Sequence, residues 1–92
     1  MSGAVEFEIF SFPNCARCDD LKAYLSQTGI EGREYDLTRR EGKKRIREYL
    51  KVLNRDEKGG IIIPTLVIRE SGEVAAVLNT REELGAWLTS RG

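Results

Sequence analysis

Apolar and polar side chains alternate at the start of the chain. Residues 5–9 place apolar side chains between glutamates, and the apolar run continues to Phe12. This period of two predicts a strand that ends at the turn marked by Pro13. From Cys15 to Gly29 the apolar side chains recur three and four residues apart. We therefore predict a helix that begins at Cys15 and ends at Gly29, a residue type typical of helix ends.

The middle of the chain predicts a second strand and a second helix. Residues 33–37 alternate charged and apolar side chains, which is typical of a strand. Thr38 and Glu41 have the spacing of a capping box, and an apolar stripe of helical period follows as far as Leu53. We therefore expect a helix that Thr38 caps and that the charged segment 54–60 ends.

The last third of the chain predicts a hairpin and a final helix. Residues 61–68 are rich in β-branched side chains, which favours a central strand, and a turn-like segment separates them from the apolar residues 74–78. Thr80 and Glu83 repeat the capping-box spacing before a further apolar stripe. The expected order is β-α-β-α-β-β-α, an α/β fold in which a four-stranded mixed sheet packs against three helices.

Length and composition narrow the class of protein. The chain has 92 residues, of which 40% are hydrophobic and 33% charged, and this mix is typical of one folded domain, here residues 1–92. No apolar run reaches the roughly 18 residues of a membrane-spanning helix. The first residues lack the basic and apolar regions of a secretory signal. We therefore expect a single cytoplasmic domain with no membrane partner.

The charges balance over the whole chain but not along it. Fifteen basic residues meet fifteen acidic ones, and the zero net charge argues against a general attraction to nucleic acid. Residues 39–51 nevertheless hold seven basic and two acidic side chains, a local net charge of +5. A nucleic-acid or acidic-partner surface would explain this excess. No recognised binding fold accompanies it, so a solvated helix face is the preferred interpretation.

The residue types that carry chemistry are few. Histidine is absent, which excludes Ser-His-Asp and Cys-His catalysis and HExxH zinc sites within this chain. Two cysteines, Cys15 and Cys18, are too few for a four-cysteine metal site, so we expect no metal site. They stand where a strand ends and a helix begins, and the free amides and positive end of a helix favour a thiolate. Arg17 adds positive charge there, whereas Asp19 and Asp20 oppose it.

Such a cysteine pair suits reversible dithiol chemistry. One helical turn separates the two residues, so their sulfurs can bond without movement of distant backbone. Cys15 is the predicted attacking thiol and Cys18 the predicted resolving thiol. A C-x-x-C spacing also occurs by chance, in metal sites and among buried hydrophobic residues. Cysteines that are merely buried therefore stay open as an alternative.

Two motifs carry a resemblance to a known family. Residues 12–18, Phe-Pro-Asn-Cys-Ala-Arg-Cys, follow the first strand, and residues 63–65, Ile-Pro-Thr, open the third. With the hairpin and final helix that follow, they resemble the thioredoxin superfamily and look most like glutaredoxin over nearly the whole chain. The resemblance implies a cis peptide bond before Pro64 and an Ile63 backbone that pairs with an extended substrate beside Cys15. It implies substrate-binding roles for Pro13, Asn14, Ala16, Arg17, Ile63, Pro64 and Thr65.

The resemblance leaves the electron donor open. Glutaredoxins usually have paired glycines at the start of the last helix, where this chain has residues 78–80, Leu-Asn-Thr. A glutathione carboxylate could bind the amides of Thr80 and Arg81, although helix capping is the commoner role for such a threonine. The buried acid of thioredoxin is also missing, so Cys18 lacks an obvious proton carrier. No metal or organic cofactor is required, and the expected reductant is glutathione or an enzyme of the thioredoxin-reductase type.

We therefore expect a monomeric thiol–disulfide oxidoreductase of the cytoplasm. Its partners would be disulfide-containing proteins or mixed disulfides with glutathione, and nucleic acid is not an expected partner. Two alternatives stay open. One is a thioredoxin-fold binding module without turnover, and the other is an iron–sulfur carrier in which two chains and two glutathiones share a cluster.

Overall fold

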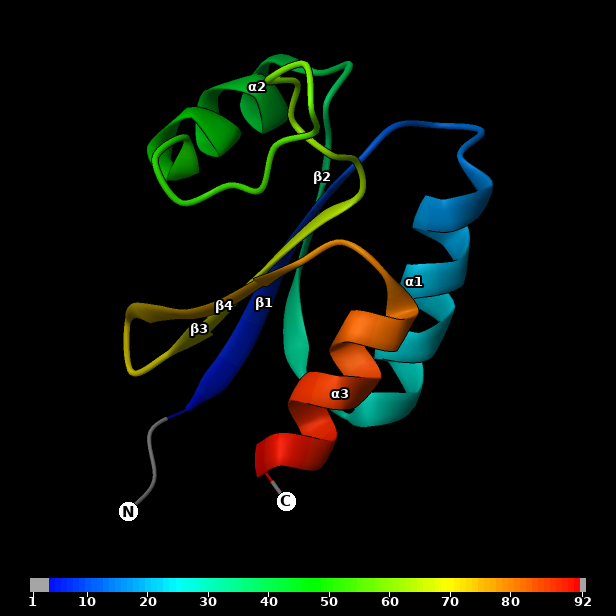
Figure 1. The fold of residues 1–92 in the computed structure, drawn as a ribbon, viewed down its shortest axis with the longest axis vertical. Helices are drawn as coiled ribbons and strands as arrows, with labels where there is room; N and C mark the ends of the chain where they lie inside the picture. The colour runs from blue at the N-terminus through cyan, green and yellow to red at the C-terminus, as the bar shows by residue number, and fades with distance from the viewer. Residues whose placement is uncertain (1–3, 92) are drawn as a thin grey trace.

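The computed structural model describes residues 4–91 and shows a twisted sheet with helices on both faces (Figure 1). A short 3-10 helix, η1, is the only element beyond the predicted order β-α-β-α-β-β-α among these residues, and that order is confirmed. The elements are β1 (Val5–Ser11), α1 (Ala16–Thr28), β2 (Glu31–Asp36), α2 (Arg40–Ile46), η1 (Arg47–Tyr49), β3 (Thr65–Glu70), β4 (Glu73–Leu78) and α3 (Arg81–Arg91).

The four strands form one mixed sheet in the order β2-β1-β3-β4. β1 runs parallel to β2 and antiparallel to β3, and β3 and β4 form the antiparallel hairpin. The first four residues of β3 are buried, which agrees with the central position predicted from its continuous apolar run. The two edge strands, β2 and β4, are largely exposed at their first residues.

The two faces of the sheet have separate apolar cores. In Figure 1, α1 and α3 cover one face, and α2 with η1 covers part of the other. Successive residues of a strand point to opposite faces, so Ile9 packs with the α1 and α3 side and Phe10 with the α2 side. The core under α1 and α3 contains Ile9, Leu21, Leu25, Leu66, Ile68 and Leu84. The core under α2 contains Phe10, Leu37, Ile46, Tyr49, Leu53 and Val67.

The expected cap at Thr38 is wrong. Its hydroxyl donates to the Asp36 carboxylate over 2.6 Å, and its backbone N–H donates to the same oxygen over 2.8 Å. The Thr38 side chain therefore belongs to a turn after β2. The charged Asp36 carboxylate is a strong hydrogen-bond acceptor, so the Thr38 hydroxyl donates to it instead of accepting an N–H of the helix. α2 begins at Arg40 with no side-chain cap. Its α-helical part ends at Ile46, and η1 continues the turn, so the helix is shorter than predicted.

The expected caps at the other two helices are confirmed. Gly29 ends α1 with φ 76°, a left-handed conformation that glycine adopts without steric cost. The Thr80 hydroxyl accepts the N–H of Glu83 at 3.0 Å, as a residue at the start of a helix should. The Glu83 carboxylate accepts the N–H of Asn79 at 2.8 Å, one residue before the position expected in a capping box.

A buried ion pair attaches α2 to the sheet. The Glu8 side chain on β1 is 8% exposed, and its carboxylate accepts hydrogen bonds from the Arg45 guanidinium and the Tyr49 hydroxyl. Arg69 lies 3.6 Å away. Burial by itself raises the pKa of Glu8, but the hydrogen bonds from Arg45 and Tyr49 and the charges of Arg45 and Arg69 outweigh it and hold that pKa below its ordinary value. Glu8 is therefore charged in the folded protein at neutral pH.

Candidate dithiol site

The two cysteines lie at the junction of β1 and α1, as the sequence predicts. Asn14 has φ 56°, a left-handed turn conformation that asparagine tolerates, and it directs the chain from the strand into the helix. Cys15 caps α1: its Sγ accepts the N–H of Cys18 at 3.1 Å, and its carbonyl accepts the N–H of Asp19 at 3.0 Å. The two sulfurs form a disulfide, with the Cα atoms 5.2 Å apart. The helix start thus brings the pair together.

The two sulfurs differ in their access to solvent. Cys15 is half-buried, whereas Cys18 is 0% exposed. The residues that flank Cys15, including Pro13, Asn14, Ala16 and Arg17, are exposed. A reacting molecule can therefore approach Cys15 but not Cys18.

The predicted cis peptide bond between Ile63 and Pro64 is confirmed. β1 and β3 are antiparallel and pair Phe10 with Thr65, so the residues after β1 and the residues before β3 lie at one end of the sheet. The structure thus brings the Ile63–Pro64 segment to the same end as Cys15. Pro64 and Thr65 are buried, and Ile63 is half-buried.

Asn79 holds the Pro64 segment in place, a role that sequence reasoning missed. Its side-chain amide donates to the carbonyls of Pro64 at 2.9 Å and Ile62 at 3.0 Å, and its Oδ1 accepts from Asn54 at 2.8 Å. The Thr65 hydroxyl also donates to the Ile62 carbonyl, at 2.6 Å. Asn79 is 6% exposed. In the sequence, its only signal is an amide between an apolar strand and the cap of a helix.

The proposed glutathione-carboxylate residues also lie at this end of the sheet. Thr80 and Arg81 line a cavity of about 70 Å³ between α1 and α3, together with Arg17 from the cysteine turn. The lining has two arginines and two carboxylates, and Arg81 lies 3.1 Å from the Asp20 carboxylate and stacks over the ring of Tyr24. The full lining is Arg17, Asp20, Asn79, Thr80, Arg81 and Glu82. The structure brings these residues together but gives the cavity little net positive charge.

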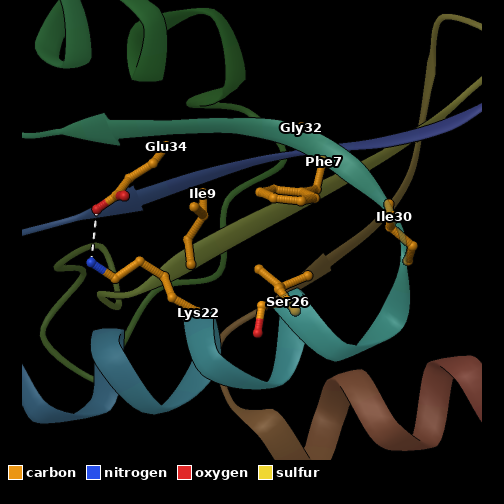
Figure 2. Close-up of a pocket in the computed structure, with 8 residues that line it drawn as sticks. Phe7, Ile9, Lys22, Ser26, Ile30, Gly32 and Glu34 are labelled. Carbon is orange, nitrogen blue, oxygen red and sulfur yellow. Dashed lines mark hydrogen bonds and ion pairs between the residues drawn. The ribbon is translucent and has the colours of Figure 1, made fainter.

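A larger hollow lies away from the cysteines, between α1 and β2. Figure 2 shows Phe7, Ile9 and Ile30 around its interior and an ion pair between Lys22 and Glu34 at one side. Its volume is about 240 Å³. The Lys22 ammonium lies 2.8 Å from the Glu34 carboxylate, and this hydrogen bond raises the pKa of Lys22. Neither cysteine lines this hollow.

The buried carboxylate of Glu8 cannot act as the proton carrier for Cys18. Glu8 and Phe10 are two residues apart on β1, so both face α2, whereas Cys18 belongs to α1 on the opposite face.

Among residues 4–91, no three Cys, Asp or Glu side chains form a group that could hold a metal ion. In the same part of the chain, no helix is long and apolar enough to cross a membrane.

Comparison with models of protein families identifies the family of the chain. The family model described as glutaredoxin matches residues 7–72, a segment that includes both cysteines and Pro64. The chain belongs to the glutaredoxin family. Membership of the glutaredoxin family and the Cys15–Cys18 pair together support a thiol redox function. None of the curated proteins compared with the chain matches it.

Solved structures confirm the thioredoxin-like fold of this glutaredoxin-family chain. A thioredoxin from Malassezia sympodialis, Mala s 13, has a TM-score of 0.62 at 15% identity, covering 96% of this chain and 75% of its own. The oxidised thioredoxin of Plasmodium falciparum has a TM-score of 0.62 at 12% identity, covering 97% and 81%. A designed protein has a TM-score of 0.65 at 18% identity, covering 97% and 77%. Identities this low show the fold alone.

Proposed function

We propose that this chain is a thiol–disulfide oxidoreductase in which Cys15 attacks and Cys18 resolves. The observation that carries the proposal is the difference in access: Cys15 is half-buried with exposed neighbours, and Cys18 is fully buried directly behind it. The Cys18 N–H that points at the Cys15 sulfur from 3.1 Å would stabilise negative charge on that sulfur. A hydrogen bond to a thiolate and the start of a helix both lower the pKa of a cysteine.

The proposed reaction transfers two electrons to the substrate. The Cys15 thiolate attacks one sulfur of a disulfide, forms a mixed disulfide and releases the other sulfur as a thiolate. The Cys18 thiol then loses its proton to solvent or the departing thiolate and attacks the sulfur of Cys15. The mixed disulfide breaks, the second substrate sulfur leaves as a thiolate, and the Cys15–Cys18 disulfide remains. Two glutathione thiols or a thioredoxin-reductase-type enzyme would return the pair to its reduced form.

The substrate would bind around the exposed turn and the Ile63 segment. Arg17 and Asn14 are exposed beside Cys15, and Ile63 is half-buried in the segment before β3. The Thr65 side chain is committed to the Ile62 carbonyl, so its contribution would be to hold the segment rather than to touch the substrate. Protein disulfides and mixed disulfides with glutathione are the proposed substrates.

Turnover with each donor tests this proposal. Reduction of a small protein disulfide and of a glutathionylated peptide is followed with glutathione and glutathione reductase, or with thioredoxin reductase. We expect Cys15→Ser to abolish both reactions. Cys18→Ser is expected to lose reduction of the protein disulfide but to retain the glutathionylated peptide, where external glutathione can replace the resolving thiol. Wild-type protein that is inert with both donors would instead favour a binding module.

A further inference from the structure

Four basic side chains form one row on the exposed face of α2 and η1. Their spacing of three, four and seven residues places them on one side of a helix, and together they line a hollow of about 480 Å³. All four residues are exposed. We name this surface the α2 basic row, and its members are Arg40, Lys43, Lys44 and Arg47.

The fold does not neutralise the α2 basic row. Arg45, on another side of the helix, pairs with Glu8 and Glu48, whereas no residue of the row forms an ion pair anywhere in residues 4–91. Like charges three or four residues apart destabilise a helix. The ion pairs of residues 4–91 therefore leave the charge of the row available to a partner.

The charge distribution favours an acidic protein segment over nucleic acid. Residues 39–51 hold seven basic and two acidic side chains, and because the whole chain is neutral, the remaining residues carry a net charge of −5. Nucleic-acid-binding domains are usually basic overall, whereas this chain has no net charge. Tyr49, the aromatic residue of this segment, is buried and cannot stack on a base. The row spans about 10 Å of helix, a length that a short run of carboxylates can match.

The position of the α2 basic row relates it to the cysteines. β1 and β2 are parallel and pair Ser11 with Asp36 at their ends, so the chain enters α2 at the same end of the sheet at which it enters the Cys15 turn. Figure 1 shows α2 and the start of α1 at this end, on opposite faces of the sheet. The row and Cys15 thus share one end of the sheet.

We propose that the α2 basic row docks an acidic segment of the disulfide-containing protein that Cys15 attacks. This inference rests on the proposed function and adds the substrate class. Opposite charges accelerate encounter and orient the two proteins. The row therefore raises kcat/KM for acidic substrates, and salt reduces the gain because the charges are exposed.

Two peptides with the same disulfide test the inference. Both are closed by one intramolecular disulfide, and they differ only in a tail of eight glutamates or eight glutamines. In wild-type protein at low salt we expect kcat/KM to be about tenfold higher for the glutamate peptide. The preference should fall to about twofold or less in Lys43→Gln/Lys44→Gln. Arg33→Gln/Lys58→Gln removes the same charge from exposed positions outside the row and should keep the preference.

Three results would overturn the inference. The first is equal turnover of the two peptides by wild-type protein that does reduce the uncharged bis(2-hydroxyethyl) disulfide. The second is an equal loss of preference in the control variant, which would show a general effect of charge. The third is tighter binding of a 20-base-pair DNA duplex than of a cysteine-free octaglutamate peptide, measured by fluorescence anisotropy. Wild-type protein that reduces none of the disulfides defeats the proposed function, and the anisotropy measurement then decides separately whether the row binds acidic peptide.

Discussion

The side-chain amide of Asn79 donates a hydrogen bond to the carbonyl of Pro64 over 2.9 Å. This contact joins the end of β4 to the segment before β3, fifteen residues earlier in the chain. The same amide holds the Ile62 carbonyl, so one buried side chain fixes the backbone on both sides of Ile63. The position of the proposed substrate-binding segment thus depends on a residue outside both sequence motifs.

Replacement of Asn79 by alanine should destabilise the protein. The Pro64 carbonyl would lose the amide donor in a buried site, whereas the Ile62 carbonyl would keep the Thr65 hydroxyl, and the cost is about 2 kcal/mol in the free energy of unfolding. Urea denaturation measures this loss. Asn54→Ala is the control: it removes the donor to Asn79 Oδ1 but leaves both carbonyls bonded to Asn79, so its loss should be smaller. Equal losses in the two variants would show that the carbonyl contacts are not what stabilises the segment.

The reduced protein should show two thiols of very different reactivity. Cys15 is accessible and accepts the Cys18 N–H, whereas Cys18 is fully buried. We expect iodoacetamide at pH 7 to modify Cys15 at least about a hundredfold faster than Cys18, because alkylation requires both a thiolate and access. Mass spectrometry of timed digests measures both rates. Comparable rates would contradict the proposed assignment of roles.

Glu8→Gln should cause a large loss of stability. Glutamine keeps the size of the side chain but places an amide donor near the Arg45 guanidinium and removes the buried one of its two carboxylate partners, Glu8 and Glu48, at a cost of about 3 kcal/mol. Chemical denaturation at pH 7 measures the loss. The neighbouring strand residue Glu6 is exposed, so Glu6→Gln should change the free energy of unfolding by less than about 0.5 kcal/mol.

The same carboxylate predicts part of the acid sensitivity. The pKa of Glu8 is lower in the folded protein than its ordinary value of 4.5. Its stabilising effect is therefore complete above about pH 4.5 and is lost as the pH falls through the folded pKa. Wild type should lose more stability than Glu8→Gln between pH 5 and pH 2. Parallel pH profiles would show that Glu8 does not contribute in this way.

Tyr49 predicts the alkaline behaviour. Burial, followed by the hydrogen bond to Glu8, raises the pKa of Tyr49 from 10.0 to about 12. A raised pKa contributes stability that is complete below the unfolded value and is lost as the pH rises through the folded value. Wild type should thus lose roughly 2 kcal/mol more than Tyr49→Phe between pH 10 and pH 12. Tyr35→Phe, which removes a tyrosine hydroxyl from the edge strand β2, is the control.

The order of elements could be predicted because each depends on local pattern. The period of two before Phe12, the helical stripe to Gly29 and the Thr80 cap all rest on residues close together in the sequence, and all three are confirmed. The cis bond before Pro64 came from resemblance to a family rather than from the residues themselves. The predicted helix cap at Thr38 was wrong because the Thr38 hydroxyl donates to Asp36. The local sequence is compatible with either a helix cap or a turn at this threonine.

The long-range polar contacts could not be predicted. The sequence pattern places Glu8 on the polar face of a strand. Its partner Arg45 lies 37 residues away in the chain and contacts it only when α2 packs on the sheet. The sequence pattern places Asn79 in a turn. The carbonyls that it contacts, those of Ile62 and Pro64, belong to the segment that precedes the β3–β4 hairpin. Such contacts depend on which strands become neighbours, and the alternation of side chains does not contain that information.

Trapping the intermediate tests the central claim most directly. Reduced Cys18→Ser protein is mixed with a protein disulfide, quenched in acid and analysed by mass spectrometry. The proposed mechanism predicts a covalent adduct on Cys15 that persists in this variant, because no second thiol is present to release it. Wild-type protein should pass through the adduct and end with a Cys15–Cys18 disulfide. Failure of Cys18→Ser to form an adduct, or an adduct that still forms in Cys15→Ser, would contradict the assignment of Cys15 as the attacking thiol.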